Sequence, residues 1–533
     1  MKRFFFLCCL MPLMAAAQGP QADTLAMIDQ IMSKWNEQTP GGVLTVFRNG
    51  QLYYQKAFGM ADLEHQVPNT TASLFEAGSV SKQFTATAVL LLANDKKLSL
   101  DDDVRKYVPE LPAYSKPITI RHLLNHTSGL RDWGVVAGIA GWERTTRVYT
   151  QANALDYISR QKGLNHAPGE RYLYSNSNYT LLCFIAERVS GQKLPEFTAE
   201  RIFKPLGMTR TQWRNNFRQI IPGRTVAYSR NKQGYEQTMP FENTYGHAAL
   251  LTTTEDLSTW NQSWAKQAFG NEVGQMRITQ GILNNGKKIA YAGGVFVNQY
   301  NGLTEISHSG ATAGYRAWMA WYPGPALSVV CLSNDAATSP IVLSKKVTAL
   351  LLGAPGEKPQ DTVSLTTPQA NAFTGIYKND QGHELLRITA SGKTVFLADT
   401  IRLQASSPSL LLAPGARKLA LAANRQHLQL ITADDTVTYT RVQPYQPSPQ
   451  ELNGYTGTFF SAECNATQQV ALKNGRLVII RHPSNKSVLT PAFRQGNTVG
   501  FTSGDHVLYL FDQRKPGFMA SASRAEGIVF TRE

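Results

Sequence analysis

The order of its secondary-structure patterns constrains the fold of this chain more than any other feature. Residues 41–59 predict two strands around an Asn49-Gly50 turn, a strong hairpin signal. Helical patterns dominate residues 79–215, strand patterns return over 290–335, and a last helix ends near residue 353. Strands from both ends can pair across the helical middle. We therefore expect an α+β fold, an antiparallel sheet with helices on its faces and an inserted helical subdomain.

The composition changes after residue 353. Residues 356–369 are polar and proline-rich and are predicted to link a first domain, 18–355, to the C-terminal part of the chain. After the linker the sequence has no helical periodicity, and its short alternating patterns are typical of strands. A weak repeat with an offset of 82 residues, NAFTGIYKND at 371 and NGYTGTFFSA at 453, predicts two small all-β barrel-like modules, 370–445 and 450–533. Their role stays open between a substrate-restricting lid, a carbohydrate-binding module and a dimer contact.

The first residues have the pattern of a secretory signal peptide. Lys2 and Arg3 precede an apolar run over 4–17 that ends in small residues, which predicts a signal peptide over 1–17. No later apolar run reaches 18 residues, so no membrane span is expected. We therefore expect a bacterial protein that is secreted or periplasmic.

The charged residues and the cysteines exclude some function classes. The chain has 53 Lys and Arg against 38 Asp and Glu, a formal charge of +15, but the basic residues are spread out and form no basic helix. A nucleic-acid partner is therefore not expected. Cys183 and Cys331 lie in apolar runs and are expected to be buried free thiols, whereas Cys464 stays open. The cysteine spacing matches no metal site.

The stretch FEAGSVSKQF contains the first candidate for chemistry, Ser79 and Lys82. A Ser-x-x-Lys spacing alone means little, because the chain has four others, which begin at Ser159, Ser190, Ser229 and Ser263. Here, however, the residues after Lys82 are apolar on all sides, so the helix should be buried. A buried lysine is costly unless it has partners or a task, and positions i and i+3 share a helix face. Ser79 is therefore the candidate nucleophile.

Two triplets far along the chain add to this pair. Tyr174-Ser175-Asn176 comes just before an apolar helix, and the other Tyr-x-Asn triplet of the chain begins at Tyr377. His308-Ser309-Gly310 stands at the end of a strand pattern and is the single His/Lys-Ser/Thr-Gly triplet present. Each triplet alone is weak evidence, whereas the set in this order is specific.

The three motifs resemble those of the penicillin-recognising serine hydrolases. The branch is that of class C β-lactamases, secreted D-Ala-D-Ala carboxypeptidases, D-aminopeptidases and related esterases. The resemblance covers residues 22–353 and includes supporting stretches such as ITIRHLLNHTSGL and PGERYLYSNSNY. The two trailing modules resemble, more loosely, the accessory barrel-like domains that follow some members, D-aminopeptidases among them.

The resemblance implies a mechanism through an acyl-enzyme. Ser79 would attack a carbonyl, while Lys82 and Tyr174 would share the proton transfers; which of the two is the acylation base stays open. Asn176 would orient the substrate amide and the Lys82 ammonium. The backbone N–H groups of Ser79 and Ala311 would form the oxyanion hole. The implied substrate-binding residues are Asn176, His308, Ser309, Gly310, Ala311 and Arg316. No cofactor and no metal are expected.

His308 departs from the β-lactamase branch, which usually has lysine there. A neutral imidazole would anchor a carboxylate less well, so a β-lactamase is the less favoured alternative. Arg316 would supply the missing positive charge, or it is a solvated strand arginine.

We expect a secreted serine hydrolase acting on an amide or ester, either a D-amino-acid peptide, which could derive from peptidoglycan, or a small ester. A non-catalytic penicillin- or cell-wall-binding protein is a further alternative. The sequence leaves the oligomeric state open. His122 and His126 could be a metal pair, but His126 is expected to be structural.

Overall fold

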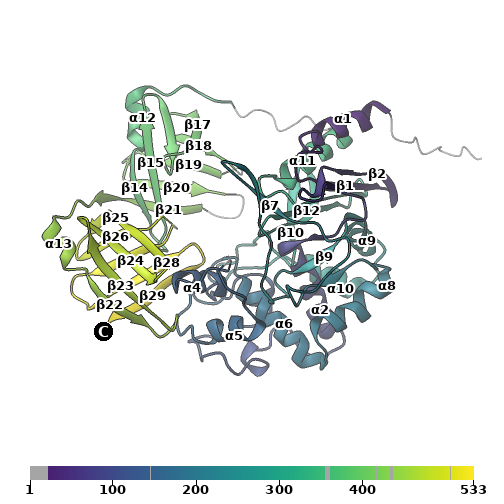
Figure 1. The fold of residues 1–533 in the computed structure, drawn as a ribbon, viewed down its shortest axis with the longest axis horizontal. Coiled ribbons are helices and arrows are strands. Elements are labelled where there is room, and N and C mark those ends of the chain that lie inside the picture. Colours follow the sequence, from purple (N-terminus) through teal and green to yellow (C-terminus); the bar gives the residue numbers. More distant parts are fainter. Residues whose placement is uncertain (1–21, 145, 354–360, 415–416, 433–435, 505) are drawn as a thin grey trace, which may run out of the picture.

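The computed structural model describes residues 22–144, 146–353, 361–414, 417–432, 436–504 and 506–533 (Figure 1). The predicted signal peptide and the first residues of the predicted linker lie outside these ranges. Among the described residues, none of the helices combines the length and the hydropathy that a membrane crossing requires.

A six-stranded antiparallel sheet joins the two ends of the first domain, as the sequence predicted. Its spatial order is β10-β11-β12-β13-β1-β2. The strands are β1 Gly42–Arg48, β2 Gln51–Phe58, β10 Phe296–Tyr300, β11 Leu303–Thr312, β12 Tyr315–Tyr322 and β13 Leu327–Ser333. Gly42 pairs with Ser333, so the beginning and the end of the domain meet in the middle of the sheet. Asn49 and Gly50, both with positive φ, make the predicted hairpin turn.

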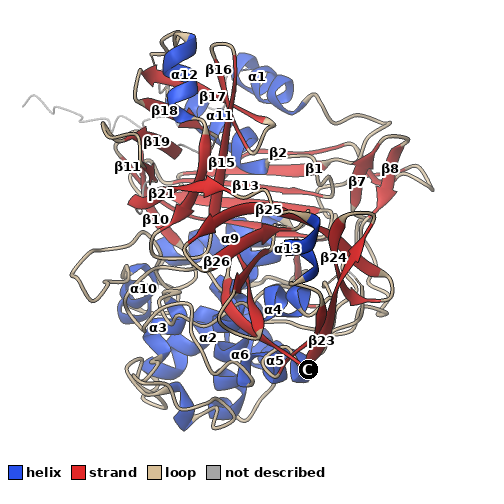
Figure 2. Cartoon of the chain, turned by 90° about the vertical axis from the view of Figure 1, so that its left-hand side faces the viewer, coloured by secondary structure: helices blue, strands red, loops and turns tan. Residues whose placement is uncertain are grey.

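Both faces of this sheet are covered. Successive side chains of a strand point to opposite faces. Leu44 packs with the buried residues of α1 (Ala22–Met32) and α11 (Pro340–Leu352), whereas Val43 belongs to the core shared with α2 (Lys82–Asn94) and α9 (Thr254–Ala265). The sheet is therefore the middle layer between two sets of helices (Figure 2).

The helical middle of the chain forms the predicted subdomain. Its centre is α2, in which every residue from Lys82 to Leu92 is buried, as expected from its apolar sequence. The other helical segments of this part are η1 Gly78–Ser81, η2 Val104–Lys106, α3 Ile120–Leu124, α4 Trp133–Ile139, α5 Gln151–Ser159, α6 Asn176–Ser190, α7 Leu194–Thr198, η3 Ala199–Phe203, α8 Lys204–Leu206 and α10 Asn271–Ile278. Short strands join it to the main sheet: β3 Met60–Asp62, β4 Val67–Pro68, β5 Phe75–Glu76, β6 Gln212–Trp213, β7 Tyr228–Asn231, β8 Gly234–Gln237 and β9 Leu250–Thr252.

The C-terminal region consists of two rings of eight antiparallel strands. Pairing of β14 with β21 closes the first ring, and pairing of β25 with β26 closes the second. The first contains β14 Gly375–Asn379, β15 Leu385–Ser391, β16 Thr394–Leu397, β17 Ile401–Ser407, β18 Leu410–Ala413, β19 Arg417–Leu421, β20 His427–Ile431 and β21 Thr436–Pro444. The second contains β22 Gly457–Ser461, β23 Ala466–Lys473, β24 Arg476–His482, β25 Asn485–Gln495, β26 Thr498–Thr502, β27 Leu508–Asp512, β28 Gly517–Ala522 and β29 Ala525–Arg532. The predicted barrel-like modules are confirmed.

Each barrel is preceded by a short helix that the sequence patterns did not reveal. These are α12 (Thr367–Phe373), which begins inside the predicted linker, and α13 (Pro449–Asn453). Both begin with a capping box, whose first residues, Thr366 and Ser448, are separated by the same 82 residues as the sequence repeat. Helices of seven and five residues are too short to show a helical period, which is why they were missed.

The second barrel packs against the helical subdomain (Figure 1). Arg131 Nη1 donates to Glu463 Oε1 at 2.7 Å, and Gln468 Nε2 donates to the carbonyl oxygen of Ile139 at 2.6 Å. Cys464 is buried at the same contact, 3.9 Å from the carbonyl of Val136, and like Cys183 and Cys331 it is a free thiol. The barrel therefore lies directly beside α4.

Candidate active site

Ser79 lies in the 3-10 turn η1, which leads directly into the buried helix α2. Two glycines let this turn approach strand β11. A Cβ on Gly78, whose φ is +52°, would lie 2.7 Å from the backbone nitrogen of Ala311. A Cβ on Gly310 would lie 1.9 Å from the carbonyl oxygen of Ala77. The turn that carries Ser79 and the strand that carries Ala311 are therefore in direct backbone contact.

Lys82 is fully buried and has three polar neighbours. Its Nζ lies 3.2 Å from Ser79 Oγ, 2.8 Å from Asn176 Oδ1 and 2.7 Å from the carbonyl oxygen of His247. The last two atoms can only accept hydrogen bonds. An ammonium at Lys82 donates to all three atoms, whereas a neutral amine donates to the last two and keeps its lone pair for the hydroxyl of Ser79.

Burial favours the neutral form of Lys82. Burial is the main cause that lowers the pKa of Lys82 well below its usual value. The Asp132 carboxylate opposes this effect, and the guanidinium groups of Arg524 and Arg144 add to it. A lysine with a lowered pKa can act as a general base near neutral pH.

Tyr174 lies over this cluster. Lys82 Nζ is 4.9 Å from the centroid of its ring, and the ring of His126 is 4.2 Å away, centroid to centroid. The phenolic oxygen is buried and has no hydrogen-bond partner in the described part of the chain. Burial raises the pKa of Tyr174, while the Ser79 hydroxyl lowers it to a smaller extent. The phenol is therefore neutral, and the Ser79 hydroxyl lies near it without forming a hydrogen bond of normal geometry.

Asn176, the first residue of α6, is held by a residue that the motifs did not include. Asp132, the N-cap of α4, accepts hydrogen bonds from the backbone nitrogen of Asn176 at 2.8 Å and from its Nδ2 at 2.9 Å. This contact fixes the amide so that its oxygen faces Lys82. Asp132 in turn forms an ion pair with Arg524 Nη1 at 3.4 Å.

The third motif lies on β11, and its histidine is neutral. Burial lowers the pKa of His308 to about 3. Nδ1 lies 2.6 Å from the carbonyl oxygen of Ser309, which can only accept, so Nδ1 carries the proton. Nε2 therefore accepts a hydrogen bond from the hydroxyl of Tyr291 at 3.0 Å. His308 presents no charge to a substrate.

A cavity of about 880 Å³ brings the predicted residues together. The predicted residues that line it are Ser79, Tyr174, Asn176, His308, Ser309, Gly310, Ala311 and Arg316. Lys82 lies below its floor, with no exposed surface. The Nη1 group of Arg316 donates to the carbonyl oxygens of Ala313 and Tyr315, at 2.8 and 2.7 Å, and the residue is partly exposed in the cavity wall.

Sequence reasoning missed three charged residues of this site, Asp132, Arg144 and Arg524. Asp132 lies in a loop with no motif, and Arg144, which also lines the cavity, is paired with Glu242 through a 2.8 Å hydrogen bond. Arg524 comes from the second barrel, about 350 residues beyond Tyr174. No spacing rule joins such positions. His247, in the stretch YGHAAL, supplies the carbonyl oxygen that is a partner of Lys82.

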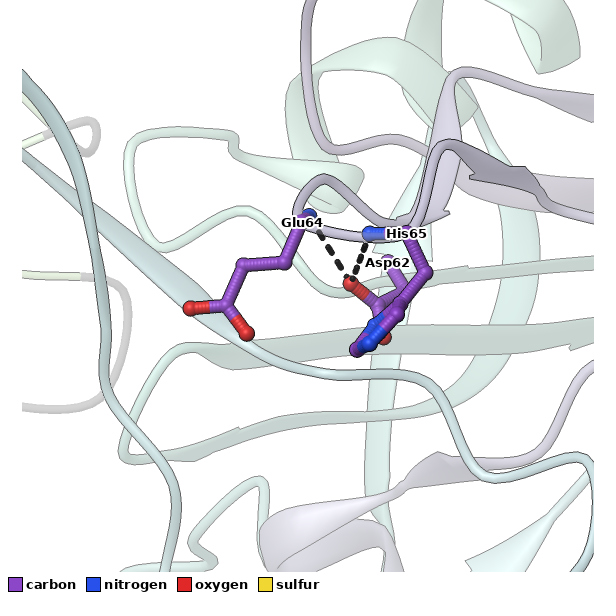
Figure 3. A group of neighbouring side chains, drawn as sticks. All are labelled: Asp62, Glu64 and His65. Atoms are coloured by element: carbon purple, nitrogen blue, oxygen red, sulfur yellow. Dashed lines mark hydrogen bonds and ion pairs between the residues drawn. The ribbon is translucent and has the colours of Figure 1, made fainter.

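The described residues give no support for a metal at His122 and His126. His122 Nδ1 accepts from the backbone nitrogen of Thr119 within a capping box, and His126 Nδ1 accepts from Asn178 Nδ2 at 3.0 Å. One group of possible metal ligands, Asp62, Glu64 and His65, lies on the surface (Figure 3). There the backbone nitrogens of Glu64 and His65 both donate to Asp62, which is the pattern of a hydrogen-bonded turn.

Comparison with known proteins agrees with this geometry. Residues 25–353 match the family model described as Beta-lactamase. The chain is 30% identical over 368 residues to penicillin-binding protein 4* of Bacillus subtilis (strain 168), a match that covers 65% of this chain and 79% of that protein. It is also 30% identical over 323 residues to a D-aminopeptidase of Cereibacter sphaeroides (strain ATCC 17029 / ATH 2.4.9), over 58% of this chain and 60% of the relative. The match thus spans about three fifths of the D-aminopeptidase.

Solved structures share the fold. The octameric penicillin-binding protein homologue from Pyrococcus abyssi superposes with a TM-score of 0.56 at 22% identity, covering 92% of this chain and 99% of that one. A D-amino acid amidase from Ochrobactrum anthropi SV3 has a TM-score of 0.53 at 20% identity and covers 63% of this chain and all of its own. The family match extends over more than half of the chain and includes all three motifs. The chain therefore belongs to the beta-lactamase family of penicillin-recognising serine hydrolases.

Proposed function

We propose that this protein is a secreted hydrolase of D-amino-acid peptides or small esters, with Ser79 as its nucleophile. The contact of Ser79 Oγ with the buried amine of Lys82, 3.2 Å away, carries this proposal, because burial lowers the pKa of that amine. Lys82 takes the proton of Ser79 as its oxygen attacks the substrate carbonyl, and the carbonyl oxygen becomes an oxyanion between the backbone N–H groups of Ser79 and Ala311. An acyl-enzyme forms and water resolves it.

Tyr174 returns the proton to the leaving group. Its hydroxyl is buried and neutral, so it can donate its proton to a leaving nitrogen and then take from the Lys82 ammonium the proton that Lys82 removed from Ser79. Asn176, held by Asp132, orients the substrate amide. Each of these motif residues thus has one task in a single reaction.

The neutral His308 favours peptides and esters over β-lactams. A lysine at this position would bring a fixed positive charge beside Tyr174, whereas the pKa of His308 is about 3 and its imidazole stays uncharged. The cavity of about 880 Å³ has space for a short peptide. The similarity to a D-aminopeptidase and to a D-amino acid amidase supports a D-configured substrate.

The test compares the full-length mature protein with its Ser79→Ala variant by intact-mass analysis. Both are exposed to D-amino-acid peptides and amides, their L-enantiomers, nitrophenyl esters and penicillins. We expect release of D-configured products and acyl adducts on the wild type alone. Fast turnover of a chromogenic cephalosporin would favour a β-lactamase instead. Stable penicillin adducts without turnover of any substrate would favour a non-catalytic penicillin-binding protein.

A further inference from the structure

The second β-barrel reaches into the catalytic cavity with one hairpin. The turn between β28 and β29 carries Arg524, whose carbonyl oxygen accepts hydrogen bonds from the backbone nitrogen of Asp132 at 2.9 Å and from Asn165 Nδ2 at 3.2 Å. Its side chain lines the cavity, and its guanidinium carbon lies 6.0 Å from the centroid of the Tyr174 ring. The turn is therefore fixed at the site by its backbone, independently of its charge.

A chain of contacts joins this guanidinium to Lys82. Arg524 Nη1 lies 3.4 Å from Asp132 Oδ2, the same oxygen accepts from Asn176 Nδ2 at 2.9 Å, and Asn176 Oδ1 lies 2.8 Å from Lys82 Nζ. Asp132 is only 2% exposed. A buried carboxylate needs a counter-charge, and the nearest cation within this chain of contacts other than Arg524 would be a protonated Lys82.

The other groups that face Lys82 cannot replace Arg524. Arg144 follows α4 and is already paired with Glu242. Burial lowers the pKa values of His126, His247 and His308, which are therefore neutral, and raises those of Tyr174 and Tyr179, whose phenols stay protonated. Among the described groups near Lys82, Arg524 is thus the cation that pairs directly with Asp132, and Arg144 acts on the carboxylate to a smaller extent.

We propose that Arg524 is a positioning residue of the active site, supplied by the second barrel, which holds the charge of Asp132 so that Lys82 can remain an uncharged base. This inference rests on the proposed role of Lys82. The second barrel would thus contribute to catalysis through Arg524, because the hydrolase domain alone would contain Asp132 without the cation that pairs with it.

The test is the pH dependence of Ser79 labelling by a fluorophosphonate, measured on the full-length protein. The labelling rate follows the fraction of Lys82 that is neutral, so it falls at low pH. In Arg524→Gln the unbalanced Asp132 carboxylate raises the pKa of Lys82, so the acid limb of the labelling profile should move to higher pH by roughly one unit. Charges within ~4–6 Å shift a pKa by about 1–3 units, and the partial exposure of Arg524 places the effect at the low end of that range. At a pH below the acid limbs of both proteins, Arg524→Gln is then labelled about tenfold more slowly than the wild type. On the plateau at high pH the two proteins are labelled at the same rate.

Three variants separate the possible outcomes. Arg524→Lys keeps the charge and should return the limb toward its wild-type position. Arg171→Gln is the matched control, because it removes a cation that lies 3.8 Å from Glu526 at the same barrel contact, and its limb should not move. A uniform fall in rate at all pH values in Arg524→Gln, or an unmoved limb, would overturn the inference. If Lys82→Met kept both the rate and the limb, the proposed role of Lys82 would fail instead.

Discussion

The side-chain amide of Asn176 joins Lys82 to Asp132. Its oxygen lies 2.8 Å from Lys82 Nζ and its nitrogen 2.9 Å from Asp132 Oδ2. All three side chains are buried. Since an amide has one end that accepts and one end that donates, this position separates a carboxylate from an amine without adding a charge. The orientation of Asn176 is therefore coupled to the protonation state of Lys82.

Asn176→Asp tests this coupling. The new carboxylate would face both Asp132, which repels it, and Lys82, which it would hold as an ammonium. We expect Ser79 labelling at neutral pH to fall by about 10²–10⁴-fold, the usual contribution of a positioned base. Asn379→Asp is the matched control, because Asn379 ends the other Tyr-x-Asn triplet and lies in the first barrel. Wild-type labelling by Asn176→Asp at neutral pH would contradict the coupling.

Gly310→Ala tests the contact between η1 and β11. The added Cβ would lie 1.9 Å from the carbonyl oxygen of Ala77, so the turn that carries Ser79 must move away from Ala311. Loss of one oxyanion donor typically lowers kcat by about 10²–10³-fold, and we expect that effect on ester hydrolysis. Gly274→Ala is the control, since a Cβ there, in α10, meets nothing within 4 Å. Retained hydrolysis in Gly310→Ala would show that the oxyanion is held elsewhere.

Local patterns were sufficient to predict most of the fold. The Asn49-Gly50 turn, the apolar run after Lys82 and the alternating strands after residue 370 each carry their signal within about ten residues. The helices α12 and α13 were missed because each is shorter than two to three turns, and only their capping boxes distinguish them. One sheet built from both ends of the first domain was expected because strand patterns occur there, whereas the register that pairs Gly42 with Ser333 was not.

The site was predictable only where a motif exists. Ser79, Lys82, Tyr174 and His308 belong to recognisable motifs, and all but Lys82 line one cavity. Arg524 could not be found in this way, because its place depends on how a barrel docks onto α4. Nor does the sequence show that Tyr291 accompanies His308 and donates to its Nε2. Such contacts depend on tertiary packing, which leaves no periodic pattern.

Tyr174→Phe should separate stability from catalysis. The phenolic oxygen is buried without a partner among the described residues, and an unsatisfied buried group costs about 1–3 kcal/mol. We therefore expect the variant to unfold at the same denaturant concentration as the wild type or at a higher one. Hydrolysis of a D-amino-acid amide, whose leaving nitrogen needs a proton, should fall by about 10²–10⁴-fold. A nitrophenyl ester, whose leaving group needs none, should be affected less.

Tyr377→Phe is the control for that comparison. Its hydroxyl donates to the carbonyl oxygen of Phe373 at 2.9 Å, so its loss should lower the free energy of unfolding by about 1 kcal/mol and leave both hydrolysis rates unchanged. Equal loss of amide and ester hydrolysis in Tyr174→Phe would instead indicate that the phenol acts in the attack of Ser79, as part of the acylation base.

The buried histidines predict that stability falls in mild acid. The pKa of His308 is lowered to about 3 and that of His166 to about 4, from about 6.5 in an unfolded chain. Below pH 6.5 the unfolded chain binds protons that the folded protein does not, so the free energy of unfolding decreases as the pH falls toward those values. Each such histidine contributes up to about 1.4 kcal/mol per pH unit. Denaturant titrations between pH 7 and 4.5 measure this slope.

His308→Gln should make the slope shallower by up to one histidine's contribution, because glutamine does not titrate. His65→Gln provides the comparison: His65 is exposed and Asp62 raises its pKa, so its removal cannot flatten a slope of this sign. The acid limb of Ser79 labelling should stay in place in His308→Gln, since an imidazole with a pKa of about 3 is already neutral throughout that limb. A limb that moves with this substitution would mean that His308 is charged in the working enzyme, and that the preference for peptides and esters over β-lactams has another origin.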